Sequence, residues 1–320
     1  MKQRDLRMRQ WMLIGFLAAA TCGLADGYRN PPDGPLALGR IGGRIADVDD
    51  ATAVSHNPAN LADLTGITVR PSVTLGYSEK RFTDLQGNHT TSEDPWRALP
   101  SLYATVPVKS GVLAFGVGIN VPYGQSTRWD ENSLFRYTAP YYARMKVMDV
   151  SPAVGVRVND RISVGAGLDL YYGDLKFEQF IPWSMATKNA AAPDGIMKFA
   201  GDGYAVGGNA AVAVKISESQ RVALTYKLPF NIDYDGDFDI SDIPAGMGAS
   251  PTSDFSTKFK YPQIVAAGYS VRLTETIRVE ANIEWLEHSR NRVLNLDIGS
   301  NNQLLNTLST NAIAQDWKNT

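Results

Sequence analysis

The segment Arg161–Phe180, RISVGAGLDLYYGDLKFEQF, alternates apolar residues with small or polar ones along most of its length. One face comprises Ile162, Val164, Ala166, Leu168, Leu170 and Tyr172, and the other comprises Ser163, Gly165, Gly167, Asp169 and Gly173. Such a period of two is the signature of a β-strand whose two faces meet different surroundings. Few strands of soluble sandwiches are this long, and small polar residues suit a lumen better than a packed core. The segment therefore predicts a membrane-spanning strand.

The same alternation recurs in other parts of the chain, at 150–158, 221–230, 265–273 and 277–285. Short connections alternate with long polar ones, as expected for periplasmic turns and extracellular loops. The short ones lie at 109–110, 159–160, 217–220 and 274–276, and the long ones near 78–98, 122–141, 181–195, 239–256 and 299–311. This pattern gives nine full strands and the start of a tenth. It predicts an all-β fold, a transmembrane antiparallel β-barrel, over a soluble all-β domain.

Hydropathy agrees with a barrel. Hydrophobic residues make up 44% of the 320 residues, yet mean hydropathy is −0.20. Beyond the N-terminal segment no run of 18 apolar residues could form a transmembrane helix. A closed barrel is the other structure that satisfies every backbone polar group in lipid.

An export signal is predicted at residues 1–25, where four basic residues precede the short apolar stretch 11–20 and a small-residue cleavage site. Cleavage after Ala25 would remove Cys22, the one cysteine of the chain; a lipid anchor on this residue is the less favoured alternative. Removing four basic groups and one acidic group moves the net charge from −2 to −5. No basic face then compensates for phosphate repulsion, so no nucleic-acid partner is expected.

Residues 26–65 do not alternate. Glycines and prolines break this stretch into pieces that allow only brief helical turns. Forty compact, glycine-rich residues ahead of the first strand predict either a flexible tail or a plug inside the barrel. We therefore expect a hatch at 26–65 and a barrel at 66–320.

Three motifs in this stretch resemble the N-terminal hatch of the OmpP1/FadL/TodX family, Gram-negative outer-membrane transporters of long-chain fatty acids and hydrocarbons. They are Leu38–Gly43, Ala46–Ala51 and Asn57–Leu61. The residues carried over from the family's hatch motif are Gly39, Arg40, Asp49, Asp50, Asn57, Pro58 and Ala59. Later segments match the family in the same order, at 122–129, 151–168, 261–269 and 284–285.

The resemblance implies a barrel of fourteen strands that ends in an aromatic residue. This sequence contains about nine to ten predicted strands and ends at Asp316–Thr320 without a terminal aromatic residue. We therefore expect an incomplete barrel whose last strands are missing. A naturally smaller, ten-stranded barrel is the alternative.

The resemblance also implies a route. A hydrophobic ligand is captured by extracellular loops, enters an interior pocket and exits sideways past the hatch at a kink in the third strand. The matching strand-three positions are Gly116 and Gly118, which could equally be small residues beside the plug. The matching loop positions, which could equally pack the loops together, are Trp183, Met185, Ile243, Met247 and Phe255.

The predicted function is therefore outer-membrane uptake of hydrophobic small molecules, with long-chain fatty acids as the default ligand. Aromatic hydrocarbons or alkanes, or a surface adhesin, are alternatives. Expected partners are the hydrophobic ligand, outer-membrane lipid, lipopolysaccharide and the barrel-assembly machinery. No catalytic group, cofactor or metal site is predicted. The alternating aspartates between Asp233 and Asp242 lack the spacing of a calcium loop and suggest a solvated loop base.

Overall fold

The computed structural model describes residues 27–40, 44–246, 250–299, 312–314 and 317–320. The predicted export signal at 1–25 and the predicted capture residue Met247 lie outside these ranges. Within them, no helix is both long and apolar enough to cross a membrane.

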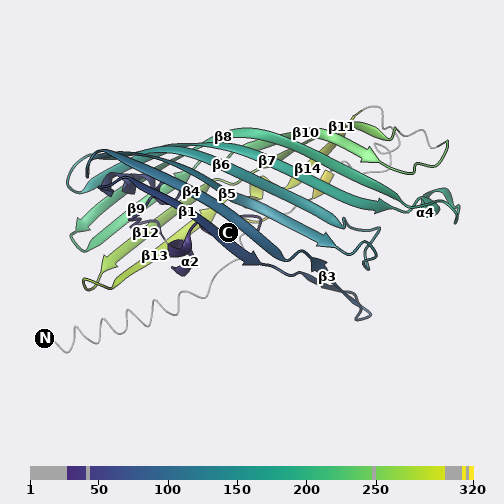
Figure 1. Ribbon diagram of the computed structural model, residues 1–320, viewed down its shortest axis with the longest axis horizontal. Coiled ribbons are helices and arrows are strands. Elements are labelled where there is room, and N and C mark those ends of the chain that lie inside the picture. The colour runs from purple at the N-terminus through teal and green to yellow at the C-terminus, as the bar shows by residue number, and fades with distance from the viewer. Residues whose placement is uncertain (1–26, 41–43, 247–249, 300–311, 315–316) are drawn as a thin grey trace.

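A single wall of antiparallel strands makes up most of the molecule, and the strands run obliquely along its long axis (Figure 1). The four longest strands are β5 (Leu113–Trp129), β6 (Tyr142–Arg157), β7 (Ile162–Ile181) and β8 (Gly195–Ser217). The others are β1 (Thr68–Tyr77), β2 (Arg81–Thr83), β3 (His89–Glu93), β4 (Trp96–Lys109), β9 (Gln220–Lys227), β10 (Asn231–Ile240), β11 (Thr252–Lys260), β12 (Ile264–Arg272), β13 (Arg278–Leu286), β14 (Val293–Ile298) and β15 (Ala312–Ala314).

The predicted two-faced character of β7 is confirmed. Leu168 and Leu170 are 57% and 46% exposed on the outer face, whereas Ser163 and Asp169 are buried inside. Because the apolar face is turned away from the lumen, it is the face that lipid covers.

Three pairs of short strands each form one longer, interrupted strand of the wall, which is called an arm below. The pairs are β9 with β10, β11 with β12, and β13 with β14. Across one interruption the ladder continues, because the Tyr261 N–H donates to the Phe230 carbonyl over 2.9 Å. The described strands therefore group into nine arms and the start of a tenth, as predicted. β1 pairs with β4 alone and lies at one edge of the described sheet.

The strands reach further into the predicted loops than the sequence suggested. β5 continues to Trp129, and the first long connection contains the β2–β3 hairpin. Phe255, predicted in a loop, lies on β11. The alternation of Phe255, Thr257 and Phe259, all buried, explains this: each faces the lumen from a regular strand.

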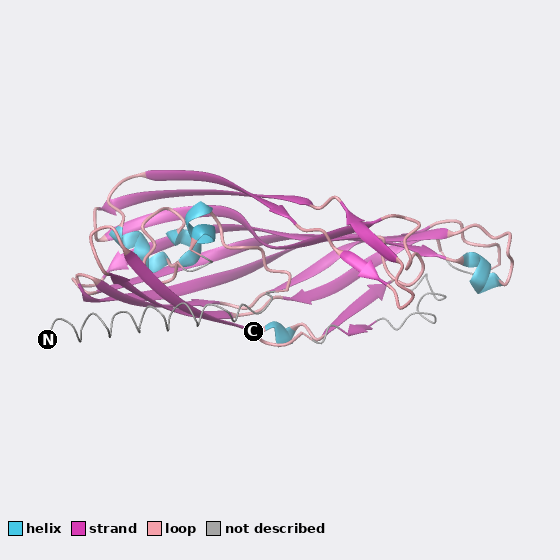
Figure 2. Cartoon of the chain, turned by 90° about the horizontal axis from the view of Figure 1, so that it is seen from below, coloured by secondary structure: helices cyan, strands magenta, loops and turns pink. Residues whose placement is uncertain are grey.

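The N-terminal segment folds into short turns inside the wall, as expected for a hatch. It forms α2 (Pro35–Gly39), α3 (Ala53–His56) and the 3-10 helix η1 (Pro58–Asp63). Figure 2 shows these helices between the strands near the end with the short turns, whereas α4 (Trp183–Thr187) lies at the opposite end. Val54 and Leu61 pack against the inward residues Tyr103 and Ala114 and are fully buried. The hatch therefore supplies the core of this half.

Candidate functional site

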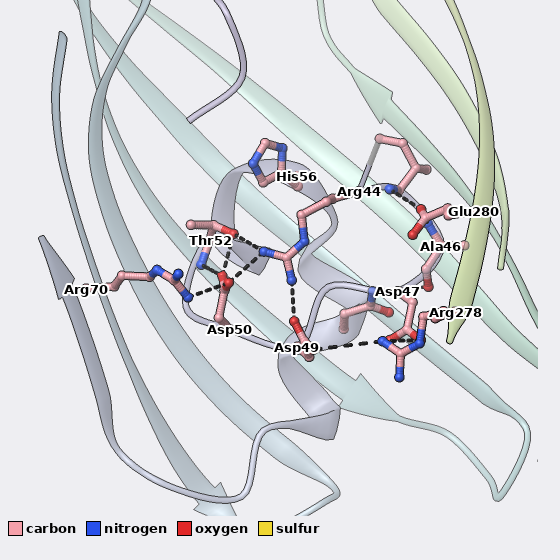
Figure 3. A network of polar contacts seen from close by, with 12 residues as sticks. Arg44, Ala46, Asp47, Asp49, Asp50, Thr52, His56, Arg70, Arg278 and Glu280 are labelled. Atoms are coloured by element: carbon pink, nitrogen blue, oxygen red, sulfur yellow. Dashed lines mark hydrogen bonds and ion pairs between the residues drawn. The ribbon is translucent and has the colours of Figure 1, made fainter. Parts of the chain in front are cut away.

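The hatch is organised around a buried arginine (Figure 3). The side chain of Arg44 is 1% exposed, and its Nη1 lies 2.6 Å from Asp50 Oδ2 while its Nη2 contacts Asp49. Asp50 also binds Arg70 of β1 at 2.6 Å and accepts the Thr52 N–H at 2.8 Å. A buried guanidinium needs such partners because an unpaired buried charge is very costly. Asp50 thus joins the hatch to the first strand of the wall.

Asp63, at the end of η1, attaches the hatch to three further strands. Its carboxylate contacts Arg157 of β6, lies 3.6 Å from Lys215 Nζ of β8 and 2.6 Å from Arg221 Nη2 of β9. Its side chain is only 18% exposed. One carboxylate therefore holds three cations that would otherwise repel one another inside the lumen.

A third attachment comes from β13. Glu280 Oε1 accepts the backbone N–H groups of Ile45 and Ala46, each at 2.8 Å. Arg278, on the same strand, lies 2.9 Å from Asp47 Oδ2. Figure 3 shows Glu280 pointing at the hatch backbone beside Ala46, and Arg278 pointing at the side chains of Asp47 and Asp49. Together these attachments fix the hatch to both flanks of the wall.

The contacts of the Asn57-Pro58-Ala59 motif hold the hatch backbone in place. Asn57 is fully buried; its side-chain amide donates to the Ile45 carbonyl over 2.6 Å, and its Oδ1 accepts the Ala59 N–H at 3.0 Å. Pro58 begins η1, where its missing N–H and fixed φ suit a first helical position. The motif thereby caps η1 and presses its backbone against the wall.

Two wall glycines make room for this motif. A Cβ on Gly165 would lie 2.2 Å from the Pro58 carbonyl carbon, and one on Gly155 would lie 2.5 Å from the Pro58 oxygen. Both occupy inward positions, on β7 and β6. The sequence marked them only as small lumen residues, which a water-filled lumen would equally explain.

The remaining hatch positions are more peripheral. Gly39 ends α2, and a Cβ added to it would meet nothing within 4 Å. Arg40 is the exposed C-cap of that helix, and its N–H donates to the Leu36 and Ala37 carbonyls. The Asp49 side chain is 53% exposed although it contacts Arg44. The structure thus brings together the acidic residues and the Asn-Pro-Ala motif, but not the Gly-Arg pair.

The irregularity of the third long strand, β5, does not lie at the predicted glycines. Gly116 and Gly118 pair in regular register with β4 and β6. The register shift falls between Asn120 and Tyr123, so Val121 and Pro122 form the bulge. A Cβ on Gly116 would lie 2.5 Å from Val54 of the hatch. Close contact with the hatch therefore explains why this position is a glycine.

Beyond this bulge, β5 separates from β4. The two strands pair as far as Ile119, opposite Leu102, and β5 is next paired at Arg128 and Trp129, with β3. Between them the described pairing with β4 is interrupted at 120–127. Arg97 of β4 crosses the interruption, with its Nη2 donating to the Ser126 carbonyl over 2.7 Å.

The N-terminal end of the hatch segment covers the inner side of this interruption. The Asn30 N–H donates to the Pro122 carbonyl over 2.9 Å, and the Asn30 side chain donates to the Val121 carbonyl over 2.7 Å. The Gly124 N–H donates to the Tyr28 carbonyl over 2.9 Å. Backbone groups of the bulge are therefore satisfied by the hatch segment, consistent with the high cost of leaving them unpaired.

Aromatic side chains fill the lumen beyond the hatch. The Tyr171 and Phe230 rings stack with centroids 3.7 Å apart, and Phe230 and Tyr261 stack at 4.5 Å. The buried cluster comprises Tyr28, Tyr123, Met145, Val147, Tyr171, Phe230, Ile232, Tyr234, Phe259 and Tyr261. Sequence reasoning missed this cluster because its members come from six separate segments.

A polar cavity of about 100 Å³ lies between this cluster and the hatch. Its lining includes Arg29, Asn209, Lys227 and Glu284. Both cations are paired: Arg29 Nη1 lies 2.6 Å from Glu284 Oε2, and Lys227 faces two carboxylates.

The two carboxylates facing Lys227 belong to Asp149 and Asp169, which are fully buried. Lys227 Nζ is 3.5 Å from Asp149 Oδ2 and 3.7 Å from Asp169 Oδ1. The lumen here already carries more negative than positive charge.

The predicted capture residues divide into two groups. Trp183 and Phe255 are both 2% exposed and share one cluster with Phe199 and Phe238, against which Ile243 packs. The Trp183 Nε1–H donates to the Ser241 carbonyl over 3.1 Å and ties α4 to the next loop. Met185, by contrast, is 72% exposed.

Sequence reasoning missed Arg44, Asp63 and the strand cations that bind the hatch. Arg157, Arg221 and Arg278 all occupy inward-facing positions of otherwise alternating strands. An arginine at an inward position of a strand indicates that an anionic group lies in the lumen. Here the acidic residues of the hatch are that group.

Two titratable hatch groups depart from their ordinary pKa. Burial opposes ionisation of Asp50, but hydrogen bonds from Thr52 and Arg44 outweigh it and lower the pKa of this carboxyl. Burial lowers the pKa of His56, with nearby Asp33 opposing the shift. Both groups therefore favour their unprotonated forms in the folded hatch.

An antiparallel wall that is apolar outside, with a lumen closed by an anchored N-terminal hatch, defines a plugged outer-membrane barrel protein. The chain belongs to the family described as outer membrane protein transport protein (OMPP1/FadL/TodX), whose model matches residues 28–320. It is therefore an outer-membrane protein.

Curated relatives and solved structures agree. The chain is 25% identical over 275 residues to a long-chain fatty acid transport protein of Escherichia coli O6:H1, covering 76% of this chain and 59% of the relative. The chain thus spans about three fifths of that relative's length.

The fold resembles a Pseudomonas aeruginosa FadL homologue, with a TM-score of 0.72, 18% identity and coverage of 92% of this chain and 76% of that one. It also resembles the Ralstonia pickettii toluene transporter TbuX, with a TM-score of 0.72, 17% identity and coverage of 90% and 80%.

Proposed function

We propose that this protein takes up hydrophobic small molecules across the outer membrane, with the hatch at 26–65 closing the lumen of a barrel wall formed by 66–320. The ligand binds at the loop end, enters the aromatic interior and leaves sideways through the wall. The observation that carries the proposal is the interruption between β4 and β5 at 120–127, directly beside an anchored hatch.

An axial route is disfavoured by the anchoring. Asp63, Asp50 and Glu280 bind the hatch to strands on both flanks of the wall. Displacing the hatch would leave several cations of the wall without partners, and each unpaired charge would cost several kcal/mol of stability. An apolar ligand also loses about 0.8 kcal/mol per CH₂ group when it re-enters water, which a sideways exit into lipid avoids.

The test removes the bulge. Deleting Pro122 makes the β5–β6 ladder continuous and leaves the pairs Asn120–Asp149 and Tyr123–Val147 in place. We expect uptake of radiolabelled ligand to fall at least ten-fold in cells that express this variant as their sole transporter of this family. Deleting Ile216, in the register shift beside the β8–β9 turn, is the matched control and should leave uptake unchanged.

Folding of both variants is checked by heat-modifiable gel mobility of the barrel. Unchanged uptake by a folded Pro122 deletion would refute exit at this interruption. Equal loss in both deletion variants would also refute it, because the effect would then be general.

Long-chain fatty acids are the first ligands to test, because the curated Escherichia coli relative is a long-chain fatty acid transport protein. Aromatic hydrocarbons are a second candidate that one observation favours. The interior cluster is mostly aromatic, and the cations at its base are already paired with carboxylates. Among the residues that the structure describes, a fatty-acid carboxylate would meet no uncommitted cation there, whereas a neutral ring would stack.

Competition decides between these ligands. Excess unlabelled toluene should block uptake of labelled toluene, and oleate should compete at least ten-fold less well if the interior favours neutral rings. If oleate competes better than toluene, the fatty-acid assignment stands and the aromatic one fails.

A further inference from the structure

The outer face of the wall changes character abruptly near the loop end. On β7 the outward residues Leu168, Leu170 and Tyr172 are followed by Asp174 and Lys176. The Tyr172 ring lies 5.1 Å from the ring of Tyr204 on β8. Tyrosine pairs at the edge of an apolar band mark the boundary between hydrocarbon and headgroups. The charged residues immediately beyond therefore lie at headgroup level.

Three cations lie together at this level on β6 and β7. Arg144 is the register partner of Lys176, and Lys146 is the next outward residue on β6, opposite Asp174. Facing residues on one side of a sheet have Cβ atoms about 5 Å apart. Like charges in such positions destabilise the sheet unless an anion lies between them.

Fewer acids than cations lie beside this group: Asp174 lies opposite Lys146, and Asp202 of β8 lies opposite Asp174. Asp174 is engaged by Arg144, whose Nε donates to Oδ1 over 2.8 Å. Glu178, the next acid on the outer face of β7, accepts the Tyr141 hydroxyl and faces Lys198 in register. Lys146 and Lys176 are exposed, and neither forms an ion pair with any residue that the structure describes.

We propose that this cationic cluster of Arg144, Lys146 and Lys176 docks a phosphate group of lipopolysaccharide in the outer leaflet. A phosphate offers several acceptor oxygens to one guanidinium and two ammonium groups, and such charge-assisted bonds are the strong ones. The apolar face directly below, at Met148 and Leu170, receives the acyl chains of the same molecule. Headgroup and chains thus match one continuous strip of the wall.

The strands that follow β7 in the sheet define where the site ends. On β8, β10 and β11 several outward residues near the same level are acidic: Asp202 lies between Asp174 and Asp235, and Asp237 faces Asp254. A phosphate would be repelled there. Lipid binding is therefore confined to β6 and β7. Lys258 and Lys260 on the outer face of β11 provide a control with the same charge change, and Lys258 is already paired with Asp233 at 3.0 Å.

The test titrates purified protein in detergent micelles with phosphorylated lipid A and follows complex formation by native mass spectrometry. We expect the variant Lys146→Ala/Lys176→Ala to bind at least ten-fold more weakly than wild type. Lys258→Ala/Lys260→Ala carries the same charge change and should bind within two-fold of wild type. Enzymatically dephosphorylated lipid A should bind wild type as weakly as phosphorylated lipid A binds the first variant.

Three results would overturn the proposal. One is equal weakening in both double variants, which would indicate a general charge effect. Another is undiminished binding of dephosphorylated lipid A. The third is displacement of lipid A by inorganic phosphate at equal concentration, which would assign the cluster to free phosphate. Ligand uptake is not the readout, so failure here leaves the proposed transport function untouched.

Discussion

The two halves of the lumen are closed in different ways. At the short-turn end the hatch fills the space and charged groups fix it, as Asp63 does with cations from three strands. At the loop end no hatch is present among the described residues, and aromatic rings such as Phe199 and Phe238 fill the space. The same wall therefore encloses a charged hatch at one end and an apolar cluster of aromatic side chains at the other.

The difference has a physical meaning. Ion pairs inside a lumen are directional, and removing one partner leaves the others unpaired at high cost. Aromatic packing is less directional, because another apolar molecule can replace one ring against its neighbour. The hatch half therefore resists displacement, whereas the aromatic half can exchange its contacts for a ligand.

The strongest way to break this contrast is Asp63→Ala. The change leaves Arg157, Lys215 and Arg221 facing one another, and we expect a loss of about 3–5 kcal/mol in unfolding free energy in lipid vesicles. Single-channel conductance should rise as the hatch loosens. Asp233→Ala, which removes an exposed ion pair with Lys258, is the control and should cost under about 1 kcal/mol. Equal behaviour of the two variants would show that burial of the ion pairs is irrelevant.

A second test acts on shape rather than charge. Gly165→Ala places a Cβ 2.2 Å from the Pro58 backbone, so the hatch must shift away from β7. We expect a cost of about 1–3 kcal/mol and a higher conductance. Gly66→Ala meets nothing within 4 Å and should change neither quantity. A Gly165 variant with wild-type conductance would mean that the motif does not seal the lumen.

These contacts also show what the sequence can predict. The wall was predictable because each strand contacts lipid on one side and the lumen on the other. The alternation of residue types within a segment such as Arg161–Phe180 therefore indicates both surroundings. The helical turns of the hatch were predictable from its glycines and prolines.

The pairing of hatch with wall was not predictable in this way. Asp63 and Arg157 are 94 residues apart, and no local pattern connects them. Gly116 illustrates the ambiguity: a small inward residue suits a kink, a water-filled lumen or a plug, and only the position of Val54 shows which applies. The bulge at Pro122, rather than a glycine, breaks the register of β5.

A third prediction concerns the loop end. Trp183→Phe keeps a ring in the aromatic cluster but removes the hydrogen bond to the Ser241 carbonyl. We expect a local loss of about 1 kcal/mol, seen as faster hydrogen exchange in α4, with unchanged conductance. Met185→Ala, at a residue 72% exposed, should alter neither quantity. A rise in conductance in Trp183→Phe would mean that the loop end also seals the barrel.

The smallest expected effect is the pH dependence of local stability. It distinguishes the hatch half from the loop half without a substitution in the wall. The folded pKa of His56 is below the ordinary 6.5, so the unfolded chain binds more protons as pH falls through this range. The hatch therefore has full stability above pH 6.5 and loses it progressively below. Asp50 adds a second loss only below its ordinary pKa of 3.8.

Hydrogen exchange in α3 should thus accelerate between pH 6.5 and 5, after correction for intrinsic rates, while exchange in α4 does not. His56→Asn should abolish the acceleration in α3. If α3 and α4 respond alike, or if the His56 variant keeps the response, then the pH dependence does not arise from the hatch and the contrast between the two halves loses its electrostatic basis.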